Sequence, residues 1–238
     1  AQQLGGPAMV VFDVGQGDAI LLRGSTGETV LVDGGPDPVL LLRKLHRFGI
    51  VRIDLAVLSH PHADHVSGMV AALESVPVGR LWHSGFVDGG PIFTELVDIA
   101  EVRGIKVEVP EAGWTADVGS IHLEVLGPMR RFASPNDQSL VLLATVEGRS
   151  VLLPGDIEVI AQRELGTVRA EVLKVPHQGA ATSDLGWLQA VRATTAIVSV
   201  GPNSFGHPSA DVIAALAGAG AQVLRTDEEG DIIIRLDP

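Results

Sequence analysis

Cysteine and tyrosine are both absent from the 238 residues of this chain, and aromatic residues make up only 4%. Without cysteine the chain has no disulfide partner, no thiol nucleophile and no thiolate metal site. A bound metal would therefore need ligands from histidine, aspartate, glutamate, asparagine or water. The small number of aromatic side chains also predicts no platform on which nucleic-acid bases could stack.

Basic residues are scarce as well. The chain has 17 lysines and arginines against 29 acidic residues, which gives a formal net charge of −12. This balance excludes a protein that coats nucleic acid through charge alone. If the substrate carries phosphate groups, bound divalent cations are the simplest source of local positive charge.

Long apolar runs are also missing. No stretch approaches the roughly 18 apolar residues that a membrane-spanning helix needs, although hydrophobic residues make up 46% of the chain. The chain begins Ala1-Gln2-Gln3-Leu4-Gly5-Gly6, with no initiator methionine, basic n-region or apolar h-region. We therefore expect a single soluble domain over residues 1–238, excised from a longer protein.

Short apolar or β-branched runs alternate with amphipathic runs, which is typical of an α/β protein. The pattern predicts strands at residues 9–14, 19–23, 29–32, 53–58, 79–82, 106–109, 120–126, 139–146, 150–153, 171–175, 195–200, 222–225 and 231–236. It predicts helices at residues 36–48, 65–75, 91–103, 157–165, 184–191 and 208–217. Two mixed β-sheets packed face to face, with helices outside, would satisfy this order.

The strongest chemical signal is Ser59-His60-Pro61-His62-Ala63-Asp64-His65. Three histidines and a carboxylate follow a predicted buried strand and precede a predicted helix, so a rigid base would project them into one small volume. Neutral imidazoles and carboxylates are ligands that Zn²⁺ and Mn²⁺ accept. The alternative is a solvent-exposed turn that happens to be rich in histidine.

The motif His60-x-His62-x-Asp64-His65 resembles the H-x-H-x-D-H motif of the metallo-β-lactamase fold. Other segments resemble further motifs of that fold: Asp33-Gly34-Gly35, Leu152-Leu153-Pro154-Gly155-Asp156 and Val175-Pro176-His177-Gln178-Gly179. The resemblance covers essentially the whole chain. It implies a four-layer αββα sandwich and a hydrolase with two divalent metal ions, and it implies that the Asp156 carboxylate bridges the two ions.

Within that fold, one branch fits best. Phe12-Asp13-Val14-Gly15-Gln16-Gly17-Asp18-Ala19 resembles the opening motif of the hydrolase domain in the ComEC competence protein family. Leu173 to His177 and Ser204 to Ser209 are similar to later motifs of that branch. The resemblance implies a domain attached to the membrane channel portion of the same parent protein. It would then lie on the extracytoplasmic side and take part in DNA uptake.

The resemblance also implies a ligand set. The first metal would take His60, His62, Asp156 and an oxygen of Asn136 or Asp137, and the second would take Asp64, His65, Asp156 and His177. Many members of the fold have a third histidine on the first metal. The nearest histidine before Asp156 is His122, which we predict to pack in the core within the strand at 120–126. A hard oxygen ligand there favours Mn²⁺, with Zn²⁺ as the alternative.

The other candidates each have two interpretations. Asp13, Asp18 and Asp33 either accept turn N–H groups or line the site, where Asp33 would orient a ligand histidine. Lys174 is three residues before His177, so regular strand alternation would place it on the opposite face as a solvated lysine; the resemblance instead implies a phosphate contact. His207 would sit near the N-cap of the helix at 208–217, where phosphate binds well.

These residues predict a metal-dependent deoxyribonuclease that hydrolyses DNA, with single-stranded DNA favoured, on the non-transported strand during natural transformation. Asp64, His207 and Lys174 are the predicted catalytic residues, and the latter two would stabilise charge or protonate the leaving oxygen. One alternative is a small-molecule phosphodiesterase resembling phosphorylcholine esterase. Another is a non-catalytic, metal-stabilised module of a DNA-uptake machine.

Overall fold

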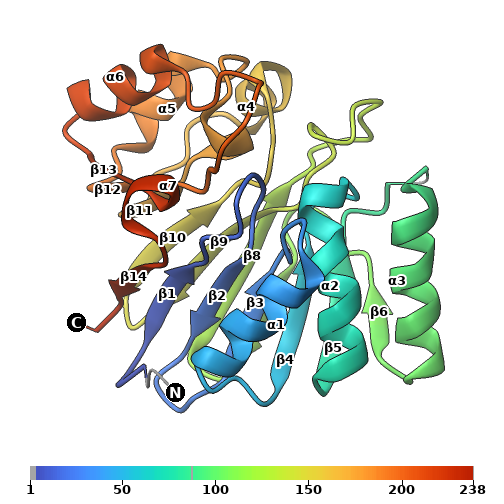
Figure 1. The fold of residues 1–238 in the computed structure, drawn as a ribbon. Coiled ribbons are helices and arrows are strands. Elements are labelled where there is room, and N and C mark those ends of the chain that lie inside the picture. The colour runs from blue at the N-terminus through green and yellow to red at the C-terminus, as the bar shows by residue number, and fades with distance from the viewer. Residues whose placement is uncertain (1–3, 87, 238) are drawn as a thin grey trace.

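Two seven-stranded mixed β-sheets pack face to face, and helices cover both outer surfaces, as Figure 1 shows. The computed structural model describes residues 4–86 and 88–237. This arrangement confirms the predicted αββα sandwich. Among the residues described, no helix combines the length and the hydropathy that crossing a bilayer requires.

The first sheet contains most of the N-terminal half and ends on the last strand of the chain. Its spatial order is β14 (Ile232–Arg235), β1 (Ala8–Val11), β2 (Ile20–Arg23), β3 (Thr29–Val32), β4 (Ile53–Leu58), β5 (Val78–His83) and β6 (Lys106–Glu108). Strands β3 to β6 are parallel. Their outer face is covered by α1 (Pro38–Arg47), α2 (Ala63–Ser75) and α3 (Gly90–Val102).

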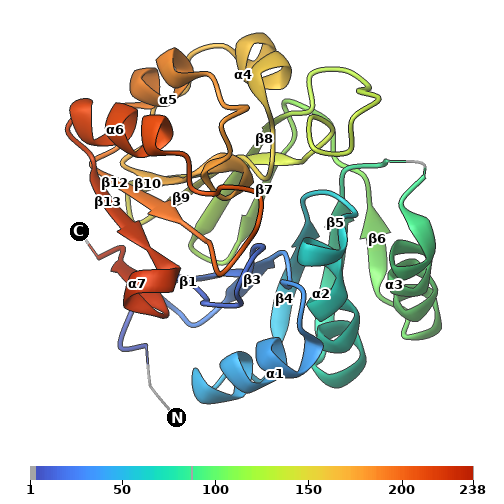
Figure 2. The ribbon, with the colours of Figure 1, turned by 45° about the horizontal axis from the view of Figure 1, so that its top comes forward.

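The second sheet has the same mixed character. Its spatial order is β13 (Gln222–Arg225), β12 (Thr195–Val198), β11 (Val172–Lys174), β10 (Arg149–Leu153), β9 (Val141–Val146), β8 (Ile121–Gly127) and β7 (Thr115–Val118). Strands β10 to β13 are parallel. Helices α4 (Val159–Leu165), α5 (Leu185–Val191) and α6 (Ala210–Gly218) lie over it in Figure 2.

Three apolar layers hold the four structural layers together, and strand β1 shows why. Ala8 and Val10 point into the core beneath the first group of helices, whereas Met9 and Val11 point into the core between the sheets. Side chains alternate across a strand, so a strand covered on both faces needs an unbroken apolar run. A third core lies between the second sheet and its own helices.

The elements missed by the sequence prediction are short and lack a clear apolar period. Strand β7, the 3₁₀ turn at Pro176–Gly179 and helix α7 (Thr226–Glu229) were not expected. β7 is a four-residue edge strand in which Thr115 and Asp117 are exposed, while Ala116 and Val118 face inward. The predicted helix at 208–217 begins later than expected, at Ala210, with Ser209 as its N-cap.

Glu28 connects the two sheets at their turns. It accepts hydrogen bonds from the backbone and hydroxyl of Ser120 and from Thr26, which lower the pKa of its carboxyl to about 2 although partial burial opposes the shift. A depressed carboxyl pKa stabilises the folded state above the unfolded pKa, and that contribution is lost as the pH falls from about 4.5 towards 2.

We therefore expect Glu28→Gln to lower the free energy of unfolding by about 1 kcal/mol at pH 6, a value reduced for solvent screening. The difference from the unsubstituted chain should shrink at pH 3.5. Urea unfolding at the two pH values measures it, and an equal difference at both would contradict the assignment.

Candidate metal centre

The histidine motif occupies the tight connection between β4 and α2. His62 is the N-cap residue of α2, and His60 and His65 are buried on either side of it. The Nε2 atom of His60 lies 3.0 Å from Nδ1 of His62, and the rings of His60 and His65 have centroids 4.1 Å apart. The predicted cluster thus comes together, and the alternative of a fully exposed turn is wrong.

Gly17 allows a second loop to approach this connection. A Cβ atom at Gly17 would lie 2.2 Å from the carbonyl oxygen of Asp64, and its φ of +129° favours glycine. The Asp18 N–H donates to the same carbonyl oxygen at 3.2 Å. This close contact carries the Asp18 carboxylate underneath the motif.

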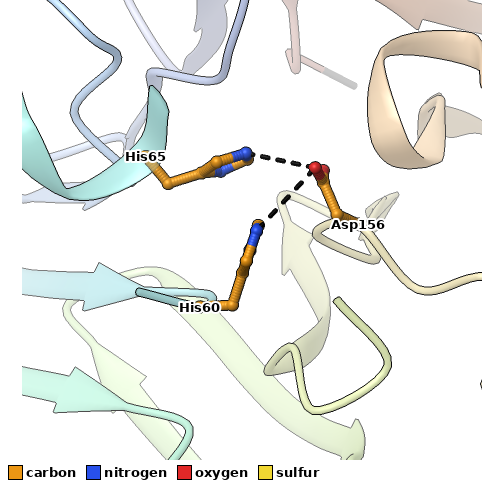
Figure 3. Close-up of side chains that lie close together, drawn as sticks. All are labelled: His60, His65 and Asp156. Carbon is orange, nitrogen blue, oxygen red and sulfur yellow. Dashed lines mark ion pairs between the residues drawn. The ribbon is translucent and has the colours of Figure 1, made fainter. Parts of the chain in front are cut away.

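Asp156 is the centre of the cluster. It follows the end of β10, and its Oδ2 atom lies 3.2 Å from Nε2 of His65, 3.9 Å from Nε2 of His60 and 4.0 Å from Nε2 of His177. Figure 3 shows the first two of these contacts. The ligand atoms of His60, His65 and Asp156 lie close enough together for metal binding. One carboxylate oxygen facing three imidazoles suits the predicted bridging position.

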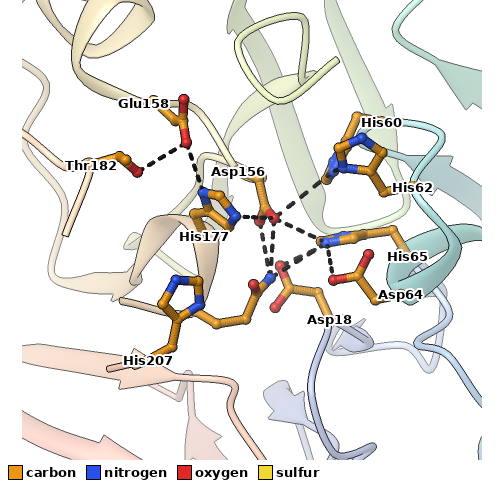
Figure 4. A network of polar contacts seen from close by, with 12 residues as sticks. Asp18, His60, His62, Asp64, His65, Asp156, Glu158, His177, Thr182 and His207 are labelled. Carbon is orange, nitrogen blue, oxygen red and sulfur yellow. Dashed lines mark hydrogen bonds and ion pairs between the residues drawn. The ribbon is translucent and has the colours of Figure 1, made fainter. Parts of the chain in front are cut away.

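His177 is oriented by a residue that the sequence analysis missed. The Oε1 atom of Glu158 lies 3.1 Å from Nδ1 of His177 and accepts a hydrogen bond from Thr182 at 2.9 Å (Figure 4). A proton held on Nδ1 leaves the Nε2 lone pair turned towards Asp156. The sequence offered one indication of this role, because Glu158 is only two residues beyond the predicted ligand Asp156.

Asp33 fixes His65 from the other side. Its carboxylate accepts two hydrogen bonds from Ser59, through the backbone N–H and the hydroxyl, each at 2.7 Å. The same carboxylate lies 2.9 Å from Nδ1 of His65. Of the two roles predicted for Asp33, the structure agrees with orientation of a ligand histidine. Asp18, Asp33 and His65 form a second group that could hold an ion.

Lys174 is buried rather than solvated. Its ammonium forms ion pairs with Asp18 and, at 3.4 Å, with Asp156, and it donates to the carbonyl oxygen of Gly155 at 3.3 Å. The side chain is only 1% exposed, so both predicted positions, in solvent and against a substrate phosphate, are wrong. Strand alternation misled because β11 ends at Lys174 and His177 lies in the turn beyond it.

The electrostatics of the buried groups suit metal ligation. Burial opposes ionisation of Asp156, but His65 and Lys174 outweigh it and hold the pKa of the Asp156 carboxyl well below its usual range. Burial and the neighbouring His65 hold the pKa of His60 well below normal. Ligands must be ionised carboxylates and neutral imidazoles, so both residues are in the form that binds a cation.

His65 has the opposite shift. Burial lowers its pKa, but the Asp156 and Asp33 carboxylates outweigh burial and hold that pKa well above its usual range. The acidic groups therefore favour a positive charge between them. A divalent cation bound at Nε2 would supply that charge in place of the proton.

The loop before β9 supplies the candidate oxygen ligands. Asp137 accepts a hydrogen bond from the Glu158 N–H at 2.8 Å, which commits one of its oxygens to the backbone. The Oδ1 atom of Asn136 is buried and has no hydrogen-bond partner within the described part of the chain. A buried, unsatisfied oxygen is what a metal ligand would leave. Asn136 therefore fits the role better than Asp137.

The prediction that His122 packs in the core is wrong. His122 lies on the outward face of β8 between the buried Ile121 and Leu123, and its ring pairs with Asp117 at 2.6 Å. Strand alternation places it outside once its apolar neighbours are inside. It is therefore not a third histidine ligand.

Gln178 is the second residue that sequence analysis missed. Its Nε2 atom lies 3.2 and 3.1 Å from the two carboxylate oxygens of Asp156 and 3.4 Å from Nε2 of His65. His177 and Gln178 both have positive φ, at 50° and 49°, which turns the two side chains into the cluster. The sequence indication for Gln178 was its place in the motif, directly after the predicted ligand His177.

An open cavity of about 540 Å³ lies beside the cluster. His62, Asp64, His177 and His207 all line it. The rings of His207 and His177 have centroids 5.2 Å apart, so His207 belongs to the site. It lies in the loop before α6, not at the helix N-terminus as predicted, because Ser209 is the N-cap.

Asp13 does not line this cavity. Its carboxylate accepts a hydrogen bond from the Gly15 N–H at 3.4 Å, and its own N–H donates to Asp231 at 2.9 Å. Of its two predicted roles, the structure agrees with the turn. The cavity is lined on that side by Gln16.

The fold and the site define a metallo-β-lactamase-type protein. The model of the metallo-beta-lactamase superfamily matches residues 12–201, and the chain belongs to this superfamily, whose members are generally metal-dependent hydrolases. The structure of the metallo-beta-lactamase fold protein YhfI from Bacillus subtilis has the same fold, with a TM-score of 0.61 and 14% sequence identity. That match covers 96% of this chain and 99% of YhfI.

Two curated relatives match most of this chain at 30% identity. ComE operon protein 3 of Bacillus subtilis (strain 168) is 30% identical over 252 residues, a match that covers 94% of this chain and 32% of that protein. Competence protein ComA of Neisseria gonorrhoeae is 30% identical over 234 residues, which covers 94% of this chain and 31% of that protein. The chain thus spans about a third of the length of these relatives.

Proposed function

We propose that this chain is a divalent-metal-dependent nuclease that hydrolyses phosphodiester bonds in DNA, with single strands preferred. The observation that carries the proposal is the position of Asp156, whose Oδ2 atom faces imidazole nitrogens of His60, His65 and His177, the last of which lines an open cavity. Similar clusters of histidine and carboxylate hold the paired metal ions of hydrolases.

The residues present fit two divalent ions. His60, His62, Asp156 and Asn136 would hold the first, and Asp64, His65, Asp156 and His177 would hold the second. The buried, unpaired oxygen of Asn136 supports this set, as do the ionised Asp156 and the neutral His60. When bound, such ions supply Lewis-acid stabilisation of phosphoryl charge and a water of lowered pKa.

His207 is the proposed hydrogen-bond donor that stabilises charge on the leaving oxygen. Burial and the nearby His177 lower its pKa, so the imidazole is neutral at physiological pH. The Nε2 atom of Gln16 lies 3.3 Å from Nδ1 of His207 and is a donor, which leaves the His207 proton on Nε2. A neutral imidazole with a fixed proton can donate to an oxygen as charge develops on it.

DNA is the proposed substrate because one curated relative is a competence protein and because the sequence motifs resemble the ComEC branch, which takes up DNA. With a net charge of −12, the chain should bind long duplexes weakly. We propose that it works as one domain beside the membrane channel portion of its parent protein, on the extracytoplasmic side. Delivery of a strand by that channel would raise the effective DNA concentration and make weak affinity sufficient.

The test is turnover of labelled single- and double-stranded DNA by the purified chain with Mn²⁺, Zn²⁺, Mg²⁺ or chelator. We expect metal-dependent cleavage, faster on single strands than on blunt duplex. If every form of DNA stays intact while a choline or nitrophenyl phosphodiester is hydrolysed, a small-molecule phosphodiesterase is the correct function. If neither DNA nor the small phosphodiester is hydrolysed, the chain is a non-catalytic, metal-stabilised module.

Metal preference gives a separate prediction. An amide oxygen from Asn136 is a harder ligand than a third imidazole, so activity should be higher with Mn²⁺ than with Zn²⁺. Asn136→His should move the preference towards Zn²⁺ and raise zinc affinity in a competition titration. Activity of the unsubstituted chain with zinc alone would contradict the role of the oxygen ligand.

A further inference from the structure

One side chain at the mouth of the cavity has no structural explanation in the fold. Phe205 is 73% exposed, and the other five phenylalanines, which also lie in the described part of the chain, are buried or half-buried. Phe12 and Phe48, by comparison, are completely or almost completely buried. Single large apolar residues are often exposed, so exposure alone does not indicate a function. The location of Phe205 is the evidence for its role.

The position is inside the candidate site. Phe205 lines the cavity of about 540 Å³ together with His62, Asp64, His177 and His207. Its ring centroid is 5.8 Å from that of His207, with an angle of 38° between the ring planes. The His207 ring in turn contacts the ring of His177, which faces Asp156. Two ring contacts therefore connect Phe205 to the candidate metal centre.

The loop that carries Phe205 is fixed before any ligand arrives. Asn203 accepts hydrogen bonds from the backbone N–H groups of Phe205 and His207, at 3.0 and 3.1 Å. Its amide nitrogen donates to the carbonyl oxygens of Gly201 and His207, at 2.9 and 2.8 Å. One side chain therefore makes four bonds across the loop, and an aromatic residue on such a loop costs little entropy when it binds.

The charge of the cavity restricts what can bind there. None of its lining residues, all of which lie in the described ranges, is a lysine or an arginine. Phosphate contacts to basic side chains, the usual source of affinity for nucleic acid, are therefore missing from the cavity walls. A strand held at this site needs another contact, and an exposed ring is the one that the cavity offers.

We infer that Phe205 is a stacking residue for a nucleobase that flanks the phosphodiester at the metal centre. This inference rests on the proposed nuclease function and names how its substrate is recognised. It runs against the expectation from the sequence that the chain has no stacking platform. Every nucleobase has a π-face, so the contact would be tolerant of sequence, and stacking on one aromatic residue contributes about 1–3 kcal/mol per base.

The test compares a 12-nucleotide thymidine oligonucleotide with an abasic chain of the same length. Binding is measured by fluorescence anisotropy at low salt in chelator, where the DNA stays intact, and KM is measured with Mn²⁺. Phe205→Ala should raise Kd and KM for the thymidine oligonucleotide about 5- to 100-fold. It should change the Kd and KM for the abasic chain less than about twofold, and Phe205→Trp should keep both values close to those of the unsubstituted chain.

Trp114→Ala is the matched control, because Trp114 is an aromatic residue, 45% exposed, that does not line the cavity. Thermal unfolding of each variant checks that the fold is unchanged. An equal loss on both oligonucleotides, or no loss on either, would overturn stacking while leaving the nuclease function intact. If the unsubstituted chain neither binds nor cleaves DNA, the proposed function fails first, and the inference fails with it.

Discussion

Replacing Lys174 by methionine should lower the free energy of unfolding by about 3–5 kcal/mol at pH 7.5. Lys174 and Asp18 are each about 1% exposed, and their ion pair lies directly beneath Asp156. Methionine has a similar shape but no charge, so the Asp18 carboxylate would stay buried without a counter-charge. Removing one partner of a buried pair is costly for that reason, whatever the net contribution of the intact pair.

The effect should depend on pH. Burial raises the pKa of Asp18 to about 6, even though Lys174 and His65 lower it, and loss of Lys174 should raise it further. A carboxyl with a raised folded pKa binds its proton more readily in the folded state, so its destabilising effect diminishes as the pH falls. The penalty in Lys174→Met should therefore be smaller at pH 5 than at pH 7.5.

Lys106→Met is the matched control. Its side chain is 70% exposed and forms an ion pair with Glu108 on the surface, so the change should cost no more than about 1 kcal/mol. The double variant Asp18→Asn with Lys174→Met should recover part of the stability lost in the single variant. Urea unfolding of all four proteins measures these values. A loss below about 1 kcal/mol for Lys174→Met would contradict the buried pair.

The layered fold could be predicted because its strands have a readable pattern. β3, β4 and β13 have the predicted bounds, since each is an apolar or β-branched run between turn residues. β7 was missed because it has only four residues, of which only Ala116 and Val118 are apolar, and that is too short a pattern to stand out. His122 shows the same limit, since one histidine within an apolar strand does not reveal which face it occupies until the neighbouring residues are placed.

The cluster of histidines and acids could be predicted because a short motif brings its own geometry. The residues that orient it could not, because their contacts cross from one loop to another. Glu158 reaches His177, and Gln178 reaches Asp156 and His65, through contacts that no local spacing encodes. Lys174 was misplaced for a related reason, since the strand ended at that residue and the rule for strand faces no longer applied.

Replacing Asp156 by asparagine should abolish turnover, with a loss of at least about 10³-fold in kcat, and should cost both metal ions. The Oδ2 atom of Asp156 lies within 4.0 Å of imidazole nitrogens on His60, His65 and His177, which belong to both proposed metal positions. An amide keeps the shape of the side chain but removes the negative charge. Loss of a ligand that both metals share should therefore empty both metal positions. Loss of a ligand that serves a single metal should empty only that metal's position.

Metal content by elemental analysis distinguishes these cases. Asp156→Asn should retain fewer than one ion per chain, and His177→Ala should retain about one, because His177 serves only the proposed second position. Asp117→Asn is the matched control, since that carboxylate is exposed and, among the residues that the structure describes, pairs only with His122 on the outer face of β8. It should keep both ions and full activity. Two ions retained in Asp156→Asn would exclude a bridging carboxylate, because each position would then be complete without it.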